Sequence, residues 1–380
     1  MAGITFPIKT EALVVEAAGS GFKRQTVYIN DMQPDEVLVE MLYTGICHTD
    51  VVGEMGQFPQ VEFPIVFGHE GAGIVRSIGS AINDPDLQVG DAVICCYNYC
   101  GHCKPCAGGR PAACAKHAEF NLHGLRQNDL STPMRLEDGR PLRCQFYGQS
   151  SFARMSVVSG KSYVRCPYPI ESLEHYSALG CGFQTGSATV LNALKPHPSK
   201  SLAIFGAGGV GMTAVMGAKV LGLETIIVVD RLADKLEMAK SFGATHTVNT
   251  ANTPDVGKAI HEITGTGADY IVECTGVPFL MDALFPSIAA EGIIAILGVP
   301  PIGYVIPFRP LDAVLDNITL RGIVQGQAVS RKYVPYMIEL HRSGQFPIER
   351  LCTTYNMDKI NEALADVRSG KVIKPILKWE

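Results

Sequence analysis

Leu202-Ala-Ile-Phe205-Gly206-Ala-Gly208-Gly209-Val210-Gly211 is a short apolar run followed at once by closely spaced glycines. In a G-x-G-x-x-G pattern, one glycine allows a tight turn, the next lets the backbone approach a pyrophosphate, and the last lets a helix pack closely on a strand. The helix that begins here points its N-terminal amides at the phosphates. The stretch therefore predicts a strand–turn–helix unit that binds a dinucleotide through Gly206, Gly208, Gly209, Val210 and Gly211.

The next strand-like run, Thr225–Val229, ends at Asp230. An acidic side chain at this place accepts hydrogen bonds from the adenosine ribose and repels a 2′-phosphate, which favours NAD over NADP. Capping of the following helix is the simpler role for Asp230, and the two roles are compatible. The neighbouring Arg231 keeps NADP as an alternative.

The pattern of apolar runs and turn residues differs before and after this stretch. Residues 1–182 carry short β-branched runs such as Glu36–Glu40, separated by glycine- and proline-rich turns, which predicts an irregular, mostly antiparallel β domain. From Ser201 onward, apolar runs alternate with helical stretches, which indicates a parallel sheet with crossover helices. We therefore expect a first domain over 1–182, a nucleotide-binding domain over 183–325, and a return to the first domain over 326–380.

Composition excludes several classes of protein. The 380 residues are 47% hydrophobic and 18% charged, enough apolar content for two packed cores. A net charge of −5 gives no basic field for nucleic acid. No apolar run approaches the roughly 20 residues that span a bilayer, and no signal peptide is evident. The expectation is a cytoplasmic protein without a membrane or nucleic-acid partner.

Four of the twelve cysteines are clustered: Cys100, Cys103, Cys106 and Cys114. Thiolates at this spacing can surround one zinc ion tetrahedrally and leave no open position, as in a structural site. An iron–sulfur cluster is the main alternative, and paired disulfides are a third. Such a closed site would stabilise an irregular loop and take no part in chemistry.

Three further candidate ligands are scattered: Cys47, His69 and Cys181. Two thiolates and one imidazole with a free fourth position make a catalytic zinc site. Singly, each has an ordinary explanation, since a lone cysteine is usually a small buried hydrophobe. Periodicity does not join the three.

A family resemblance does join them. Gly68-His69-Glu70-Gly71, Gly90-Asp91, the four-cysteine cluster, Gly180-Cys181-Gly-Phe-Gln-Thr185-Gly186, the glycine pattern and Gly298-Val299-Pro300-Pro301 follow one another as in zinc-containing medium-chain alcohol dehydrogenases. The chain resembles this family from end to end, and Phe146-Tyr-Gly-Gln-Ser-Ser-Phe152-Ala153 is similar to its aryl-alcohol (benzyl-alcohol) branch. The resemblance implies a GroES-like β catalytic domain with a Rossmann doubly wound parallel-sheet domain, and two zinc ions per subunit.

By this resemblance, Cys47, His69 and Cys181 ligate the catalytic zinc, which polarises an alcohol oxygen while a hydride passes to nicotinamide. Asp50 holds His69 and fixes its tautomer. Glu70 lies behind the metal and eases ligand exchange. Thr49 supplies the hydroxyl of a proton relay. Val52 stands where some relatives continue that relay with histidine, so the proton would leave by water or by His48.

The resemblance also assigns cofactor and substrate contacts. The cofactor contacts are His48 and Lys374 at the pyrophosphate, Asp230 and Lys235 at the adenosine ribose, and Thr185 and Val299 near the nicotinamide. The substrate cleft would be lined by Phe58, Cys96, Phe146, Tyr147 and Val299. Core packing explains about half of these equally well. The lining is apolar and aromatic, which favours a primary alcohol or aldehyde of aromatic, allylic or other conjugated type.

Related enzymes and assemblies supply the alternatives. A zinc-free enone or quinone reductase shares the fold but lacks the cysteines, and polyol dehydrogenases tend to carry glutamate where this chain has Cys181. A zinc-stabilised NAD-binding protein without turnover is a third possibility. Subunits of the family pair through the edges of their nucleotide-binding sheets, here by Ile293–Leu297 and Tyr304–Phe308. The long stretch Ala115–Gln145 favours a homodimer, with a tetramer as the alternative.

Overall fold

The computed structural model describes residues 4–380, which form two compact units. The first unit runs to Gly182 and takes in Val329–Glu339 and Pro347–Glu380. The second unit comprises Phe183–Ala328 and Leu340–Phe346. The expected return of the chain after 325 thus falls at Val329, and sequence analysis gives no sign of the excursion of Leu340–Phe346 into the second unit.

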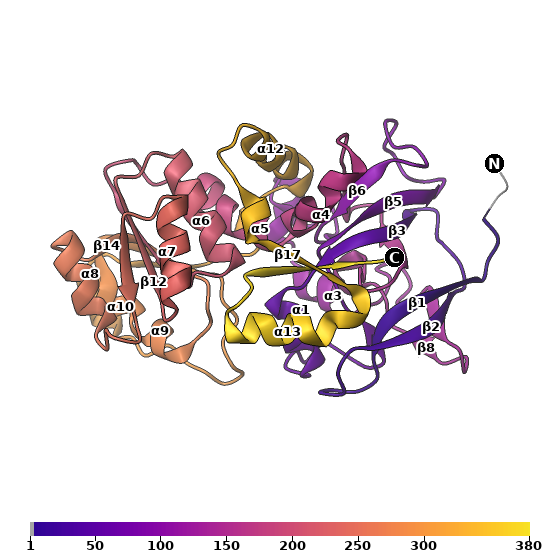
Figure 1. The fold of residues 1–380 in the computed structure, drawn as a ribbon, viewed down its shortest axis with the longest axis horizontal. Helices are drawn as coiled ribbons and strands as arrows, with labels where there is room; N and C mark the ends of the chain where they lie inside the picture. Colours follow the sequence, from indigo (N-terminus) through magenta and orange to yellow (C-terminus); the bar gives the residue numbers. More distant parts are fainter. Residues whose placement is uncertain (1–3) are drawn as a thin grey trace. The chain divides into compact units, whose positions relative to one another are not determined.

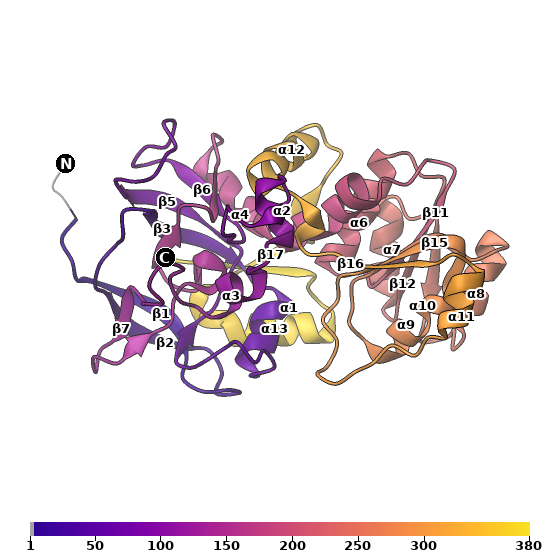
Figure 2. The same ribbon diagram turned by 180° about the vertical axis from the view of Figure 1, so that it is seen from behind.

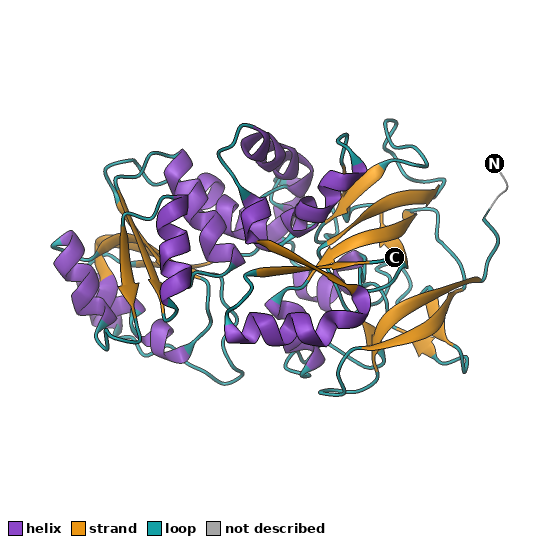
Figure 3. Cartoon of the chain, viewed as in Figure 1, coloured by secondary structure: helices purple, strands orange, loops and turns teal. Residues whose placement is uncertain are grey.

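The first unit is built from two sheets (Figures 1 and 3). The smaller has the order β4-β1-β2-β7-β8 and the larger β10-β6-β5-β3-β18-β17, with β9 also paired to β3. The strands of the smaller sheet are β1 (Ile8–Val15), β2 (Lys23–Ile29), β4 (Ile65–Val66), β7 (Met134–Leu136) and β8 (Pro141–Leu142). Those of the larger are β3 (Glu36–Gly45), β5 (Gly71–Ile78), β6 (Ala92–Cys95), β9 (Met155–Ser159), β10 (Tyr163–Arg165), β17 (Cys352–Asn356) and β18 (Lys374–Lys378).

Strand β3 is the centre of the larger sheet. It pairs antiparallel with β5, β9 and β18, so that Gly45 lies opposite Ile376 from the far end of the chain. Its residues Val37, Leu38, Val39 and Met41 are fully buried in the main core of this unit, so both faces of the sheet are covered at this strand. The irregular, mostly antiparallel domain expected from the sequence is confirmed.

Short helices connect these strands. They are α1 (His48–Glu54), α2 (Lys104–Ala107), α3 (His117–Leu122), α4 (Leu173–Tyr176) and α13 (Ile360–Ser369), with 3₁₀ turns at Phe146–Gly148 and Ser177–Gly180. Helix α1 begins where it does because the Asp50 carboxylate accepts a hydrogen bond from the backbone N–H of Cys47. Helix α12 (Ser330–Arg342) begins in the first unit, and its last three residues belong to the second.

The second unit is a six-stranded parallel sheet of order β13-β12-β11-β14-β15-β16. Its strands are β11 (Ser201–Phe205), β12 (Thr225–Asp230), β13 (His246–Asn249), β14 (Ala268–Glu273), β15 (Ile288–Ile296) and β16 (Thr319–Gly322). Helices α6 (Gly209–Val220) and α7 (Ala233–Phe242) cover one face, and α8 (Val256–Thr264), α9 (Pro278–Asp282) and α10 (Leu284–Ser287) cover the other (Figures 1 and 2). The expected doubly wound sheet is confirmed.

The expected edge of this sheet is wrong. Strand β15, which contains most of Ile293–Leu297, pairs with β14 on one side and β16 on the other, so it is an interior strand. The edge is β16, and Tyr304–Phe308 forms no strand. The error has a physical origin: β16 is only four residues long and largely exposed, so it lacks the apolar run that marks a buried strand. Within residues 4–380, every helix is too short or too polar to cross a bilayer.

Candidate functional site

The glycine pattern forms the turn between β11 and α6. Gly206 has a φ of +102°, which side-chain-bearing residues rarely adopt. A Cβ on Gly211 would lie 1.8 Å from the Gly206 carbonyl oxygen, so the helix can approach the strand only with glycine there. A Cβ on Gly208, the N-cap of α6, would meet nothing within 4 Å. The open space above Gly208 and the free amides of the first helical turn fit a bound pyrophosphate.

Asp230 lies at the carboxyl end of β12 and ties this turn together. Its Oδ2 accepts a hydrogen bond from the Ala207 N–H at 2.8 Å, and its Oδ1 accepts one from the Leu232 N–H at 3.0 Å. The N-cap of α7 is Leu232, so Asp230 does not fill the capping role that sequence analysis offered as the simpler one. Each carboxylate oxygen keeps a lone pair for a ribose hydroxyl.

The four clustered cysteines converge on one point. Their Sγ atoms all lie within 4.8 Å of one another, with 3.8 Å between Cys100 and Cys106 and 4.0 Å between Cys103 and Cys114. Four sulfurs about 2.3 Å from a tetrahedral zinc would be about 3.8 Å apart. Disulfides, with sulfurs about 2.05 Å apart, are excluded. An iron–sulfur cluster of several irons would force its cysteines farther apart.

Backbone N–H groups support this sulfur cluster. Cys103 N donates to Cys100 Sγ at 3.3 Å, Cys100 N to Cys114 Sγ at 3.4 Å, and Ala115 N to Cys103 Sγ at 3.5 Å. These donors stabilise negative charge on the sulfurs. With four sulfur donors the site is closed, so it suits a structural zinc.

The three scattered ligands are also brought together, all within the first unit. Cys47 precedes α1, His69 precedes β5, and Cys181 follows the turn Ser177–Gly180. One ligand atom from each of these residues and from Glu70 lies within 4.8 Å of the others. The fold therefore assembles the set that spacing alone left unconnected.

His69 carries the clearest sign of a metal site. Its side chain is 0% exposed, and Nδ1 is 2.9 Å from Asp50 Oδ1. The same Asp50 carboxylate accepts hydrogen bonds from the backbone N–H groups of Cys47 and Gly68, both at 3.0 Å. Nε2 of His69 is buried and has no hydrogen-bond partner among residues 4–380. A buried polar atom without a partner is costly, and a zinc ion among these donors would remove that cost.

The charges of the cluster favour ligand chemistry. Hydrogen bonding with the Cys181 thiol, aided by the positive charges of His69 and Lys374, holds the pKa of Cys47 well below its ordinary value despite burial. Burial alone would lower the pKa of His69, but Asp50 and the Cys47 thiolate raise it well above its ordinary value. The thiolate form of Cys47 is the form that binds zinc, and a zinc ion would displace the proton that His69 otherwise holds.

Glu70 lies beside these ligands and is neutralised by Lys374. The Lys374 ammonium is 2.8 and 3.0 Å from the two carboxylate oxygens of Glu70 and 3.2 Å from the Ile46 carbonyl oxygen. Gly182 N also donates to Glu70 Oε1 at 3.0 Å. Lys374 is only 5% exposed and lies against Glu70, because a buried carboxylate needs a counter-charge. Its expected contact with the cofactor pyrophosphate stays a prediction.

Helix α1 holds the residues of the expected proton relay. Thr49 Oγ1 is 3.6 Å from Cys47 Sγ, close enough to act on a group bound at the cluster. His48 is exposed, and Val52 is buried. Helix α1 therefore places the Thr49 hydroxyl beside the Cys47 sulfur and His48 at the surface. One turn further along, Val52 is apolar and buried.

Two of the expected pocket residues pack on His69, and the contacts described for two others lie elsewhere. The Tyr147 ring stacks on the His69 imidazole, with centroids 4.4 Å apart and planes inclined by 23°. Phe146 meets the same imidazole edge-on at 5.6 Å. Cys96 is buried with Sγ toward the Lys161 carbonyl oxygen, 3.9 Å away, and Phe58 is half-buried against the main core.

The remaining expected cofactor residues lie in the second unit. Thr185 is in α5 (Gly182–Ala188), Lys235 is in the first turn of α7, and Val299 follows β15 and is 38% exposed. None of the three has a contact that assigns it a role in this structure, so their parts in cofactor binding stay predictions.

Two residues near the cluster were not singled out from the sequence. Gln149 is fully buried and hydrogen-bonds to the backbone around Glu70. His117 has its ring centroid 6.3 Å from that of Tyr147, and burial lowers its pKa to about 4, so it is neutral near pH 7. Gln149 lies within the segment 146–153 whose pattern was noticed as a whole. Nothing in the sequence marks His117.

Comparison with known proteins agrees with this geometry. Residues 33–168 match the alcohol dehydrogenase GroES-like domain, and residues 209–342 match the zinc-binding dehydrogenase family. The chain is 36% identical over 370 residues to geraniol dehydrogenase of Castellaniella defragrans, covering 97% of this chain and 98% of that protein.

Solved structures give the same result. An alcohol dehydrogenase zinc-binding domain protein from Burkholderia ambifaria is 40% identical, with a TM-score of 0.91 over 98% of this chain and 99% of the other. Benzyl alcohol dehydrogenase of Acinetobacter calcoaceticus is 37% identical, with a TM-score of 0.90 over 98% and 100%. The chain belongs to the zinc-containing medium-chain alcohol dehydrogenases, a family of oxidoreductases acting on CH–OH groups.

Proposed function

We propose that this chain oxidises primary aromatic, allylic or otherwise conjugated alcohols with NAD, reversibly, at a zinc held by Cys47, His69 and Cys181, and that a second zinc lies among Cys100, Cys103, Cys106 and Cys114. The observation that carries the proposal is the buried, unpartnered Nε2 of His69 beside two cysteine sulfurs. Three protein ligands leave one coordination position for the substrate oxygen.

The chain's own residues prepare this site for the reaction. When bound, zinc supplies a Lewis acid at the alcohol oxygen and the nicotinamide supplies a hydride acceptor. Asp50 holds His69 Nδ1, so that Nε2 is the ligand nitrogen. Thr49 Oγ1 accepts the substrate hydroxyl proton and passes its own proton toward His48 or water. Val52 cannot carry a proton, so the proton leaves α1 through His48 or through water.

The aromatic surface beside His69 supports the substrate class. Tyr147 and Phe146 present ring faces and edges at the imidazole, and a flat conjugated substrate packs well against such rings. Two relatives act on alcohols of this kind by their names, benzyl alcohol and geraniol. The direction of the reaction depends on the ratio of the two cofactor forms.

The preference for NAD rests on Asp230. Its carboxylate lies at the end of β12, beside the Gly206–Gly211 turn, where a 2′-phosphate would meet a like charge. We expect NADP to be used more weakly, with Arg231 as the residue that allows it at all.

A homodimer would cover an apolar surface of the second unit. Exposed apolar side chains gather before and along the edge strand β16: Ile302, Val305, Leu311, Val314, Leu315 and Leu320. Val305 is 80% exposed and Ile302 is 72% exposed. A partner subunit would remove these side chains from water, and β16 offers an unpaired edge in the described sheet. Light scattering on the purified protein should give twice the chain mass; a monomer would contradict this assignment.

One assay tests the proposal. NADH formation is followed with benzyl alcohol, an allylic alcohol and ethanol, each with NAD and NADP, and zinc is measured on the same sample. We expect about two zinc ions per chain, benzyl and allylic alcohols oxidised faster than ethanol, and NAD preferred. One zinc per chain and no turnover with any alcohol would instead indicate a zinc-stabilised NAD-binding protein.

A further inference from the structure

The segment Phe146–Phe152, here named the aromatic segment, has an unusual backbone. Tyr147 has a φ of +54° and Ser150 a φ of +49°, with Gly148 between them at +69°. Residues with side chains rarely adopt these angles, and they persist only where the surroundings hold them. A larger residue at Gly148 would be strained, because its φ is positive and a Cβ there would lie 2.4 Å from Ser162 Oγ. Something must therefore hold Tyr147 in this conformation against His69.

The side chain of Gln149 provides that hold. It is 0% exposed, and its amide makes three hydrogen bonds. Nε2 donates to the His69 carbonyl oxygen at 2.9 Å and to the Cys96 carbonyl oxygen at 3.2 Å, while Oε1 accepts from the Gly71 N–H at 3.1 Å. The amide thus binds the main chain on both sides of Glu70, directly at the backbone that carries the imidazole ligand.

The rest of the aromatic segment is fixed to the same backbone. Ser150 Oγ donates to the Val66 carbonyl oxygen at 2.6 Å and accepts from Phe146 N at 2.9 Å. Ser151 N donates to the Gly68 carbonyl oxygen at 2.8 Å. These bonds attach the segment along residues 66–71, and within the segment the Gln149 side chain is the one that hydrogen-bonds to the backbone of both His69 and Gly71.

We propose that Gln149 is a positioning residue that holds the His69–Gly71 backbone and the Tyr147 ring in one fixed arrangement, and that this arrangement lets the enzyme select ring-bearing alcohols. The inference rests on the proposed function for its substrate class. It assigns to the Gln149-Ser150-Ser151 part of the motif a task distinct from lining the pocket. Without the amide, three buried backbone groups lose a partner, and the strained segment can relax away from the imidazole.

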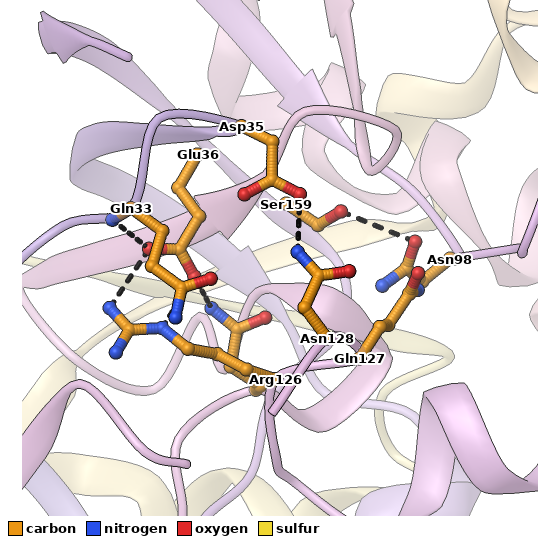
Figure 4. A pocket seen from close by; sticks show the side chains of 9 residues that line it. Gln33, Asp35, Glu36, Asn98, Arg126, Gln127, Asn128 and Ser159 are labelled. Atoms are coloured by element: carbon orange, nitrogen blue, oxygen red, sulfur yellow. Dashed lines mark hydrogen bonds and ion pairs between the residues drawn. The ribbon is translucent and has the colours of Figure 1, made fainter. Parts of the chain in front are cut away.

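A second buried glutamine in the same region offers a matched control. Gln145 is 2% exposed, and its Nε2 donates to Glu36 Oε1 at 3.2 Å and to the Val157 carbonyl oxygen at 2.9 Å. Figure 4 shows the polar cavity around Glu36, where Arg126 clasps the carboxylate and Gln33 N also donates to it. Gln145 contacts neither His69 nor Gly71, so its loss costs stability without freeing the metal-bearing backbone.

The experiment compares Gln149→Met with Gln145→Met. KM and kcat are measured for benzyl alcohol and for ethanol, which is too small to cover Tyr147. Cobalt(II) replaces zinc at the catalytic site, and its visible d–d spectrum reports the ligand geometry independently of turnover. Melting temperatures are recorded for both proteins.

For Gln149→Met we expect KM for benzyl alcohol to rise about tenfold, KM for ethanol to change by less than about threefold, and the cobalt spectrum to shift at unchanged metal content. For Gln145→Met we expect a comparable fall in melting temperature with neither the KM split nor the spectral shift. Equal behaviour of the two variants would overturn the proposal, since Gln149 would then be an ordinary buried glutamine.

Two further measurements keep the test decisive. Gln149→Asn keeps an amide but is one methylene too short to span His69 and Gly71, so it should show the same KM split. In the unmutated protein, the Gly71 amide should exchange its hydrogen slowly, and rapid exchange would refute the hydrogen bond without any variant. If the unmutated enzyme oxidises no alcohol, the proposed function fails. The cobalt spectrum and the Gly71 exchange rate would still test whether Gln149 positions the His69–Gly71 backbone.

Discussion

Cys100, Cys103, Cys106 and Cys114 lie in one loop, whereas Cys47, His69 and Cys181 come from three separate segments of the first unit. In the loop, the chain's own backbone N–H groups stabilise the sulfurs. Around Cys47, His69 and Cys181, buried side chains provide the support. Asp50 contacts the His69 imidazole, Lys374 forms an ion pair with Glu70, and Gln149 hydrogen-bonds to the backbone of His69 and Gly71. A closed site can be local, but a site with a free position must be held open by residues from elsewhere.

Removing the imidazole should have the largest effect on turnover. His69→Ala deletes one of the three proposed zinc ligands. We expect alcohol oxidation to fall by roughly a thousandfold or more, since a metal Lewis acid is worth several kcal/mol. Metal analysis should then give about one zinc per chain, bound in the four-cysteine loop. Loss of both ions would show that the two sites depend on each other.

Thr49→Ala tests the chemistry while leaving every metal ligand in place. Loss of a proton-transferring group should lower kcat by roughly a hundredfold. Thr49→Ser, which keeps the hydroxyl, should remain within about tenfold of the unmutated enzyme. Both variants should retain their full zinc content. Near-normal rates for Thr49→Ala across the pH range would remove Thr49 from the relay.

Asp50→Asn tests the supporting layer. The amide can keep a hydrogen bond to His69, but it loses the charge that fixes the imidazole, so zinc affinity should fall by about 10–100-fold. Competition with a chelator of known affinity measures this. An unchanged zinc affinity would mean that the site of Cys47, His69 and Cys181 does not depend on the Asp50 carboxylate.

Cys103→Ser should affect turnover least. It breaks the closed site, so we expect one zinc to be lost and the melting temperature to fall by roughly 5 °C, because a structural metal contributes to folding free energy. The kcat of the protein that stays folded should remain within about threefold. A collapse of kcat at full folding would show that the loop takes part in catalysis.

The same contrast explains what could be predicted from the sequence. The glycine turn and the four-cysteine loop each depend on neighbours in the chain, so spacing alone indicated them. Spacing could not join Cys47, His69 and Cys181, because their proximity is made by the pairing of distant strands. Only resemblance to a family connected these three residues.

The errors arise from tertiary context as well. No spacing in the sequence indicates the ion pair between Lys374 and Glu70. Strand β16 has too few apolar residues to mark it as a strand, so the sequence indicates its interior neighbour as the edge. Gln149 stands in a motif that was noticed, yet its three backbone partners are 53 to 80 positions away in the chain. No local pattern encodes such contacts.

Strand β18 has a consequence for how the protein is made. It inserts between β3 and β17, and it brings Lys374 to a carboxylate 304 positions earlier in the chain. During synthesis, β3 therefore lacks its partner β18, and Glu70 lacks the Lys374 ammonium, until nearly the whole chain has left the ribosome. Contacts of such long sequence separation form slowly, so we expect this part of the candidate site to be completed late in folding.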